Sequence, residues 1–204
     1  QANPNTIGSV GISNCYFKNY LSCGIYGYFA STYLSITDCE FESPLPKATE
    51  LRAIYVAGKI KVEILRNHFD NHQSSNYIYI LAATSDTVHV VGNTISNYGF
   101  PGSTFPIHGI SVEYSNYVVV KNNMVSLGWT GNQTGGVFGL LCRSNDYEYI
   151  NSNSILLLGN FTGNNSVTSF YSVGSLTSSY VHNNLFVNGV NSTTNTCAAV
   201  TNFP

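Results

Sequence analysis

The densest group of ionisable side chains in the sequence lies in two short segments, DCEFES at 38–43 and RNHFDN at 66–71. Aligned residue by residue, the segments give three neighbouring pairs: Asp38 with Arg66, Glu40 with His68, and Glu42 with Asp70. Close carboxylates can share a proton, bind calcium, or act as the acid and base of glycoside cleavage, and a nearby arginine such as Arg66 or Arg52 can hold an acidic sugar. The candidate catalytic residues are therefore Glu40, Glu42, Asp70, His68 and Arg66. The alternative is a solvated face of paired charges, including Lys18 and Glu42, that adds little stability.

Both segments belong to a repeat that runs along nearly the whole chain. An Asn or Cys recurs at one position at intervals of 24, 28, 26, 30, 30 and 31 residues. The residues at this position are Cys15, Cys39, Asn67, Asn93, Asn123, Asn153 and Asn184. A β-branched residue stands three positions before each, from Ile12 to Val181, and an apolar residue two positions after each, from Phe17 to Phe186. A period of roughly 20–50 residues indicates a solenoid, a propeller or an array.

The pattern inside each repeat favours a β-solenoid. Apolar and polar residues alternate with a period of two around each Asn, which is typical of strands, and no sustained helical stripe is found. Each repeat is shorter than a propeller blade of about 40 residues. Each repeat also holds one further apolar run, such as YIYILA from Tyr77. We therefore predict an all-β, parallel β-helix solenoid of about seven coils, each with two or three short strands, as a single domain over 1–204.

Stacked coils give the repeated asparagines a structural role. Successive coils lie about 4.8 Å apart, so residues at equal positions form ladders. An Asn at a bend can bind backbone groups and the Asn of the next coil, which satisfies polar groups that the bend leaves unpaired. Cys15 and Cys39 occupy this position in the first two coils. Their spacing permits a disulfide, or alternatively a short ladder of free thiols.

Four of the repeated strings are ISNCYFKN, ITDCEFES, VVGNTISN and VHNNLFVN. They resemble the turns of right-handed parallel β-helix proteins of the pectate lyase-like superfamily, over roughly Ile12 to Val200. That resemblance implies the fold, whereas the superfamily includes polysaccharide lyases and hydrolases, phage tailspikes and cell-surface proteins. Its lyases gather several Asp around calcium beside a basic residue. This sequence has no such Asp-rich set, so the resemblance transfers no catalytic residue.

The variable stretches between strands carry two kinds of surface feature. N-glycosylation sequons begin at Asn132, Asn160, Asn164 and Asn191, and we expect them to line one edge of the solenoid. Aromatic residues occupy two adjacent corner loops: Tyr98, Phe100, Phe105 and Trp129. They are candidates for carbohydrate contact or for a protein interface, and the alternative is that they cover the edge of the core.

Composition excludes several classes of partner. The 204 residues have a net charge of −2, and the eight Lys and Arg are scattered, so no basic surface for nucleic acid is expected. No apolar run approaches the roughly 18 residues of a membrane span. The five cysteines show no spacing for zinc, so no metal or cofactor is expected, with calcium reserved for the lyase reading. The abundance of Asn, Ser, Thr, Tyr and Gly is common in secreted and surface-exposed β proteins.

The ends of a β-helix present unpaired strand edges that favour association. The first predicted coil begins within a dozen residues of Gln1, and the last strand stops almost at Pro204. We therefore expect either an excerpt of a longer spike or subunits that stack end to end through their terminal coils. The preferred function is that of a non-enzymatic structural protein, located outside the cell, at its surface or on a virion appendage. It would form or decorate a filament, fibre or spike, in assembly or adhesion. Two alternatives stay open: a polysaccharide-degrading lyase or hydrolase, including the tailspike type, and a non-catalytic carbohydrate-binding module.

Overall fold

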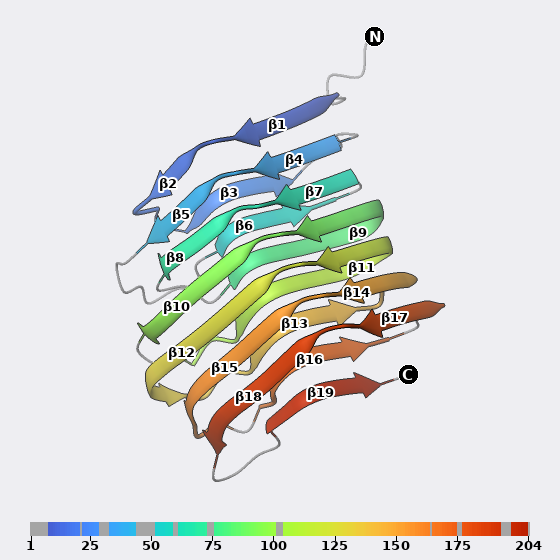
Figure 1. Ribbon diagram of the computed structural model, residues 1–204. Helices are drawn as coiled ribbons and strands as arrows, with labels where there is room; N and C mark the ends of the chain where they lie inside the picture. The colour runs from blue at the N-terminus through green and yellow to red at the C-terminus, as the bar shows by residue number, and fades with distance from the viewer. Residues whose placement is uncertain are drawn as a thin grey trace.

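The protein is a β-solenoid of about five turns, built from parallel sheets (Figure 1), and the described residues include no helix, which confirms the predicted fold class. The computed structural model describes residues 8–20, 22–28, 33–43, 52–58, 61–72, 76–100, 104–163, 165–174, 177–192 and 197–203. Within these ranges, no helix is long and apolar enough to cross a membrane.

One face of the solenoid is a seven-stranded sheet, formed by the strands that follow the repeated Asn or Cys. In chain order these strands are β2 (Tyr16–Lys18), β5 (Glu40–Ser43), β8 (His68–His72), β10 (Thr94–Phe100), β12 (Met124–Gln133), β15 (Ser154–Phe161) and β18 (Leu185–Ser192). They lie side by side in the same order, so the sheet runs the length of the rod (Figure 1).

The rest of the solenoid wall is a twelve-stranded sheet with two rows of strands. The row that precedes the Asn position contains β1 (Ser9–Ser13), β4 (Tyr33–Thr37), β7 (Lys61–Leu65), β14 (Tyr147–Asn151) and β17 (Ser178–His182). The other row contains β3 (Cys23–Tyr28), β6 (Arg52–Ala57), β13 (Val137–Arg143), β16 (Val167–Val173) and β19 (Cys197–Phe203). The long strands β9 (Asn76–Val91) and β11 (Ile107–Lys121) contribute to both rows.

The number of turns is slightly lower than the seven coils predicted from the repeats. The seven-stranded sheet does have one strand for each repeat. In this sheet, only the five described strands between β2 and β18 have a described neighbour on both sides. We call the first and last repeats the two rims of the described rod.

The core is a set of apolar ladders inside the rod. Phe17, Phe41 and Phe69 stack with ring centroids 4.8 and 4.7 Å apart. Isoleucine and valine fill the other inward positions, and from Leu34 to Phe170 these side chains are almost fully buried. Ile12, Phe17 and Phe186 lie in the first and last repeats, where each has a described ladder neighbour on one side only. They are therefore only partly buried.

The predicted asparagine ladder runs along the inside of one corner. In each interior rung, the backbone N–H donates to the side-chain Oδ1 of the next rung, at 3.0 Å from Cys39 to Asn67 and 2.9 Å from Asn67 to Asn93. The Nδ2 of each Asn donates to a backbone carbonyl in the preceding turn, as from Asn123 to the carbonyl oxygen of Val90 on β9 at 2.8 Å. At the first two positions, Cys15 and Cys39 carry free thiols, in line with the thiol ladder rather than a disulfide.

A second regularity at the same corner is a left-handed backbone conformation directly before each ladder residue. The non-glycine residues there have φ of 53–55°, and Gly92 has φ of 70°. These residues are Asn14, Asp38, Arg66, Gly92, Asn122, Ser152 and Asn183. One residue in the left-handed conformation bends the chain sharply, and Gly, Asn and Asp adopt this conformation most readily. The corner is therefore sharp, and the ladder residues from Cys39 to Asn153 are buried inside it.

Candidate functional site

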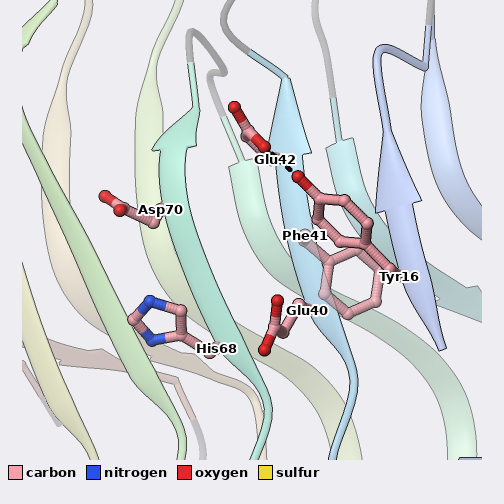
Figure 2. Close-up of a pocket in the computed structure, with 6 residues that line it drawn as sticks. All are labelled: Tyr16, Glu40, Phe41, Glu42, His68 and Asp70. Carbon is pink, nitrogen blue, oxygen red and sulfur yellow. Dashed lines mark hydrogen bonds between the residues drawn. The ribbon is translucent and has the colours of Figure 1, made fainter. Parts of the chain in front are cut away.

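The ionisable residues singled out in the sequence come together on the outer face of the seven-stranded sheet (Figure 2). They lie on β2, β5 and β8, and the register pairs Glu40 with His68, Glu42 with Asp70, and Lys18 with Glu42, as predicted. Because these strands are parallel neighbours, side chains at equal positions project side by side. The residues border a hollow of about 420 Å³: Tyr16, Glu40, Phe41, Glu42, His68 and Asp70.

Two contact groups order the charges around this hollow. Glu42 accepts a hydrogen bond from the Tyr16 hydroxyl and lies 3.1 Å from Lys18 Nζ. The hydrogen bond with Glu42 raises the pKa of both Tyr16 and Lys18. On the adjoining corner, the Arg66 guanidinium binds Asp38 with two hydrogen bonds of 2.8 and 2.7 Å, which lowers the pKa of that carboxyl.

This arrangement, which we call the charged hollow, is open to solvent. Glu40, His68 and Asp70 are all exposed, and their side chains project outward from the strands (Figure 2). Within the described ranges, no group of three or more His, Cys, Asp or Glu could hold a metal ion. Arg52, considered above as a sugar ligand, lies on β6 in the other sheet, where its guanidinium stacks 4.3 Å from the Tyr55 ring centroid. The charged hollow can attract a polar or cationic ligand, but it lacks the closed walls that exclude water from reacting groups.

The corner aromatics do not form one exposed surface. Trp129 is 4% exposed, and its Nε1 donates to Asn160 O at 2.6 Å. The indole packs over Gly159, where a Cβ would lie 2.6 Å from the ring, so Trp129 is a core residue and not a carbohydrate-contact candidate. Phe105 is exposed, whereas the side chains of Tyr98 and Phe100 lie outside the described part of the structure.

A second hollow, of about 350 Å³, lies beside Phe105 at the corner between the two sheets. It combines one aromatic ring with neutral polar groups: Thr104, Pro106, Gly135, Gly136, Phe138, Asn165 and Ser166. Such a lining suits a small uncharged ligand, and this hollow is the place where the carbohydrate-binding alternative would act.

Three of the four sequon asparagines lie in register on neighbouring strands. Asn132 on β12 pairs with Asn160 on β15, which pairs with Asn191 on β18. Asn160 and Asn191 are exposed, while Asn164 lies outside the described residues. Adjacent strands are only about 4.8 Å apart, so a glycan on one of these residues would crowd its neighbours.

Two groups of residues were not singled out from the sequence. On the outside of the twelve-stranded sheet, rings contact one another from rung to rung, with centroids 5.2–5.9 Å apart: Tyr26, Tyr55, Tyr79, His108, Phe138 and Tyr171. The rings from Tyr26 to Phe138 are stacked, whereas Phe138 meets Tyr171 edge to face, at an interplanar angle of 61°. Burial lowers the pKa of His108 to about 4, so this imidazole is neutral at pH 7. These ring contacts therefore stabilise the outer face of the twelve-stranded sheet.

The second group is a polar cluster inside the core. Glu148 is 1% exposed and accepts hydrogen bonds from Asn145 Nδ2 at 2.9 Å, Ser172 Oγ at 3.3 Å and Ser179 Oγ at 3.4 Å. Burial raises the pKa of the Glu148 carboxyl and of the neighbouring Cys142 thiol. The only sequence signal was that Glu148 stands two positions before Ile150, at an inward position of its strand.

Comparison with known proteins gives no match: no family model and no curated protein matches the sequence, and no solved structure matches the fold. Any function proposed for this chain must therefore rest on its own sequence and structure.

Proposed function

We propose that this protein is a non-enzymatic structural β-solenoid that assembles end to end into a filament, fibre or spike outside the cell. The observation that carries the proposal is the chemistry of the two end repeats. Inward positions that are buried throughout the rod emerge at both rims, with Val200 51% exposed at one rim and Ile12 and Phe17 only partly covered at the other.

The inward positions at the two rims match one another in kind, and of these Ile25 is already buried, at 8% exposed. One ladder runs through paired residues from Ile25 to Val200, a second from Ile12 to Val181, and a third from Phe17 to Phe186. A second copy placed as the next turn would set Ile25 on Val200, Ile12 on Val181 and Phe17 on Phe186. Each ladder would thus continue with an apolar partner, and the last ring pair would repeat the stacking of Phe17 on Phe41.

Such a contact is physically favourable because it combines backbone pairing with apolar burial. The opposite edges of a parallel sheet present complementary N–H and C=O groups, so a copy adds without reversing direction. Burial of a half-exposed aliphatic side chain contributes about 1 kcal/mol. The contact joins different surfaces of the two copies, so it does not close and the assembly grows along the rod axis.

A location outside the cell agrees with the surface chemistry. Only 9% of the residues are charged, and the sequence is rich in Asn, Ser, Thr and Tyr. The exposed sequon residues Asn160 and Asn191 would be accessible in a secreted protein.

The test is a charge at the rim. Val200→Asp places a carboxylate in the proposed contact, whereas Thr201→Asp places it on the outer side of the same strand. Light scattering against concentration, with negative-stain microscopy, should show association of the parent and of Thr201→Asp. Association of Val200→Asp should be weaker by about tenfold or more, because an unpaired charge would be buried. If Val200→Asp retains its fold by circular dichroism and associates as well as the parent, end stacking is wrong.

A further inference from the structure

The outer face of the seven-stranded sheet changes character along the rod. At the β2, β5 and β8 end it bears the charged hollow, whereas the strands β12, β15 and β18 contain no Asp, Glu, Lys or Arg. There the outward side chains are aliphatic and unusually exposed: Met124 48%, Leu158 38%, Leu185 60% and Val187 38%. With the partly exposed Leu156, these five residues form what we call the aliphatic face.

The strand register makes the aliphatic face continuous. Met124 and Leu185 lie in one row across the sheet, on either side of Ser154. Leu156 and Val187 are paired in the next outward row, and Leu158 follows in the row beyond. Neighbouring rows and strands bring these side chains within contact distance, so they present one apolar surface rather than scattered residues.

The sequence of β15 independently indicates that this surface is covered. Ile155 and Leu157 are buried in the core, while Leu156 and Leu158 between them point outward, so four consecutive positions are apolar. An uninterrupted apolar run is typical of a strand buried on both faces, whereas a strand with one solvated face alternates. On β8 and β10 the outward positions carry His68, Asp70, Thr94 and Ser96, which is the alternating pattern.

We propose that the aliphatic face packs against the aliphatic face of a second copy of this chain, related by a two-fold axis. A two-fold contact brings like residues together, and an uncharged aliphatic surface is complementary to itself because no charge is buried without a partner. A flat sheet face also suits another flat sheet face, since two sheets pack about 10 Å apart with their side chains interdigitated. A charged partner would find no opposite charge on these three strands.

The size of the aliphatic face predicts a weak contact for one pair. Five side chains on three strands offer a few hundred square ångströms, below the roughly 800 Å² that each partner contributes to a stable interface. If subunits also stack end to end, which rests on the proposed function, the face recurs once per subunit along the rod. Many weak contacts then act together and join rods side by side.

The experiment separates lateral pairing from end stacking. Met124→Glu/Leu158→Glu adds two charges to the aliphatic face, and Thr94→Glu/Ser96→Glu adds two charges to the same sheet on β10. Both pairs are made in the Val200→Asp background, which is designed to suppress axial growth, and the fold is checked by circular dichroism. Sedimentation velocity is then measured from about 10 to about 500 μM, a range that detects contacts of modest affinity.

We expect a reversible dimer for Val200→Asp alone and for Val200→Asp combined with Thr94→Glu/Ser96→Glu. For Val200→Asp combined with Met124→Glu/Leu158→Glu, the dissociation constant of the dimer should be about tenfold higher. In protein that keeps Val200, electron microscopy of Met124→Glu/Leu158→Glu should show rods that are as long as those of the parent but only one rod wide. The inference is overturned if Val200→Asp is monomeric throughout, or if Met124→Glu/Leu158→Glu pairs as strongly as the control. Failure of end stacking would instead appear as short particles whose sedimentation still reports the lateral dimer.

Discussion

At the scale of single residues, the most unusual group is the carboxyl of Glu148 inside the solenoid. A buried carboxylate is destabilised by loss of water, and the three hydrogen bonds from Asn145, Ser172 and Ser179 offset only part of that loss. Its pKa is raised, mainly by burial. The group therefore links folding to pH from within the core.

The sign of this linkage follows from the direction of the shift. Because the folded pKa lies above the unfolded one, the contribution of Glu148 to stability is fully present below the unfolded pKa. It is lost as pH rises through the folded pKa. Glu148→Gln keeps the shape and most hydrogen bonds without the charge. We expect it to be more stable than the parent at pH 7–8, and to approach parent stability at acidic pH, where the carboxyl is protonated in both the folded and the unfolded state.

Urea unfolding of both proteins across this pH range measures the difference. Glu40→Gln, at an exposed position in the charged hollow, serves as the control and should follow the parent curve. A constant difference between parent and Glu148→Gln at all pH values would show that the buried carboxyl does not titrate with folding.

The pairing of residues across neighbouring strands was easier to predict than the burial of individual side chains. Glu40 meets His68 and Glu42 meets Asp70 because a repeat with one register assigns all neighbours at once. The burial of Trp129 was only one of the alternatives left open by the sequence, since it depends on Gly159, thirty residues further along, which has φ of 143° and no side chain in the path of the ring. For Glu148, the only sequence signal was its place two residues before Ile150, and a charged side chain is ordinarily expected to face solvent.

At the scale of elements, the corner that links the two sheets determines how each turn is placed on the next. Asn123 is almost fully buried there: its N–H donates to Asn153 Oδ1 at 3.0 Å, and its Oδ1 accepts from the N–H of Asn93 at 2.9 Å. The backbone bends in the left-handed conformation immediately before it, so the amide replaces hydrogen bonds that the bend removes from the strands. The ladder position was predictable because Asn recurs there. The left-handed residue was not, because Arg66 and Ser152 occupy it beside the more usual Asn, Asp and Gly.

Asn123→Ala tests the contribution of this corner. The change leaves the N–H of Asn93 and the carbonyl of Val90 without their partner in a buried place, so we expect a loss of roughly 2–4 kcal/mol in the free energy of unfolding. Ser154→Ala, at an exposed position in the neighbouring turn, should change it by less than about 0.5 kcal/mol. Denaturant unfolding followed by far-UV circular dichroism gives both values. Equal stability of the two variants would mean that water replaces the amide and that the ladder does not hold the turns.

At the scale of the whole molecule, stability is expected to vary along the rod, because each turn contacts only its neighbours. Most residues of β11 in the middle are buried, whereas β18 at the rim alternates between exposed and partly exposed residues, and β17 is exposed at every position after Ser178. The spacing of the asparagines predicted the repeats, one for each strand of the seven-stranded sheet, but it gave seven coils where the solenoid has about five turns. The contrast between charged and aliphatic regions of one face was not predicted, because it depends on which residues of each repeat point outward.

Hydrogen exchange measured by mass spectrometry connects this gradient to assembly. In dilute protein, amides of β9 and β11 should exchange orders of magnitude more slowly than those of β1–β3 and β17–β19, since opening a rim breaks fewer contacts than opening an interior turn. At high concentration, end stacking should slow exchange at both rims of the parent but not of Val200→Asp, because a second copy pairs the rim backbone. Lateral pairing through side chains leaves the backbone pairing of β12 and β15 as it is. Slower exchange confined to the middle of the rod, or equal slowing in Val200→Asp, would contradict the proposal that the rims are the surfaces that join.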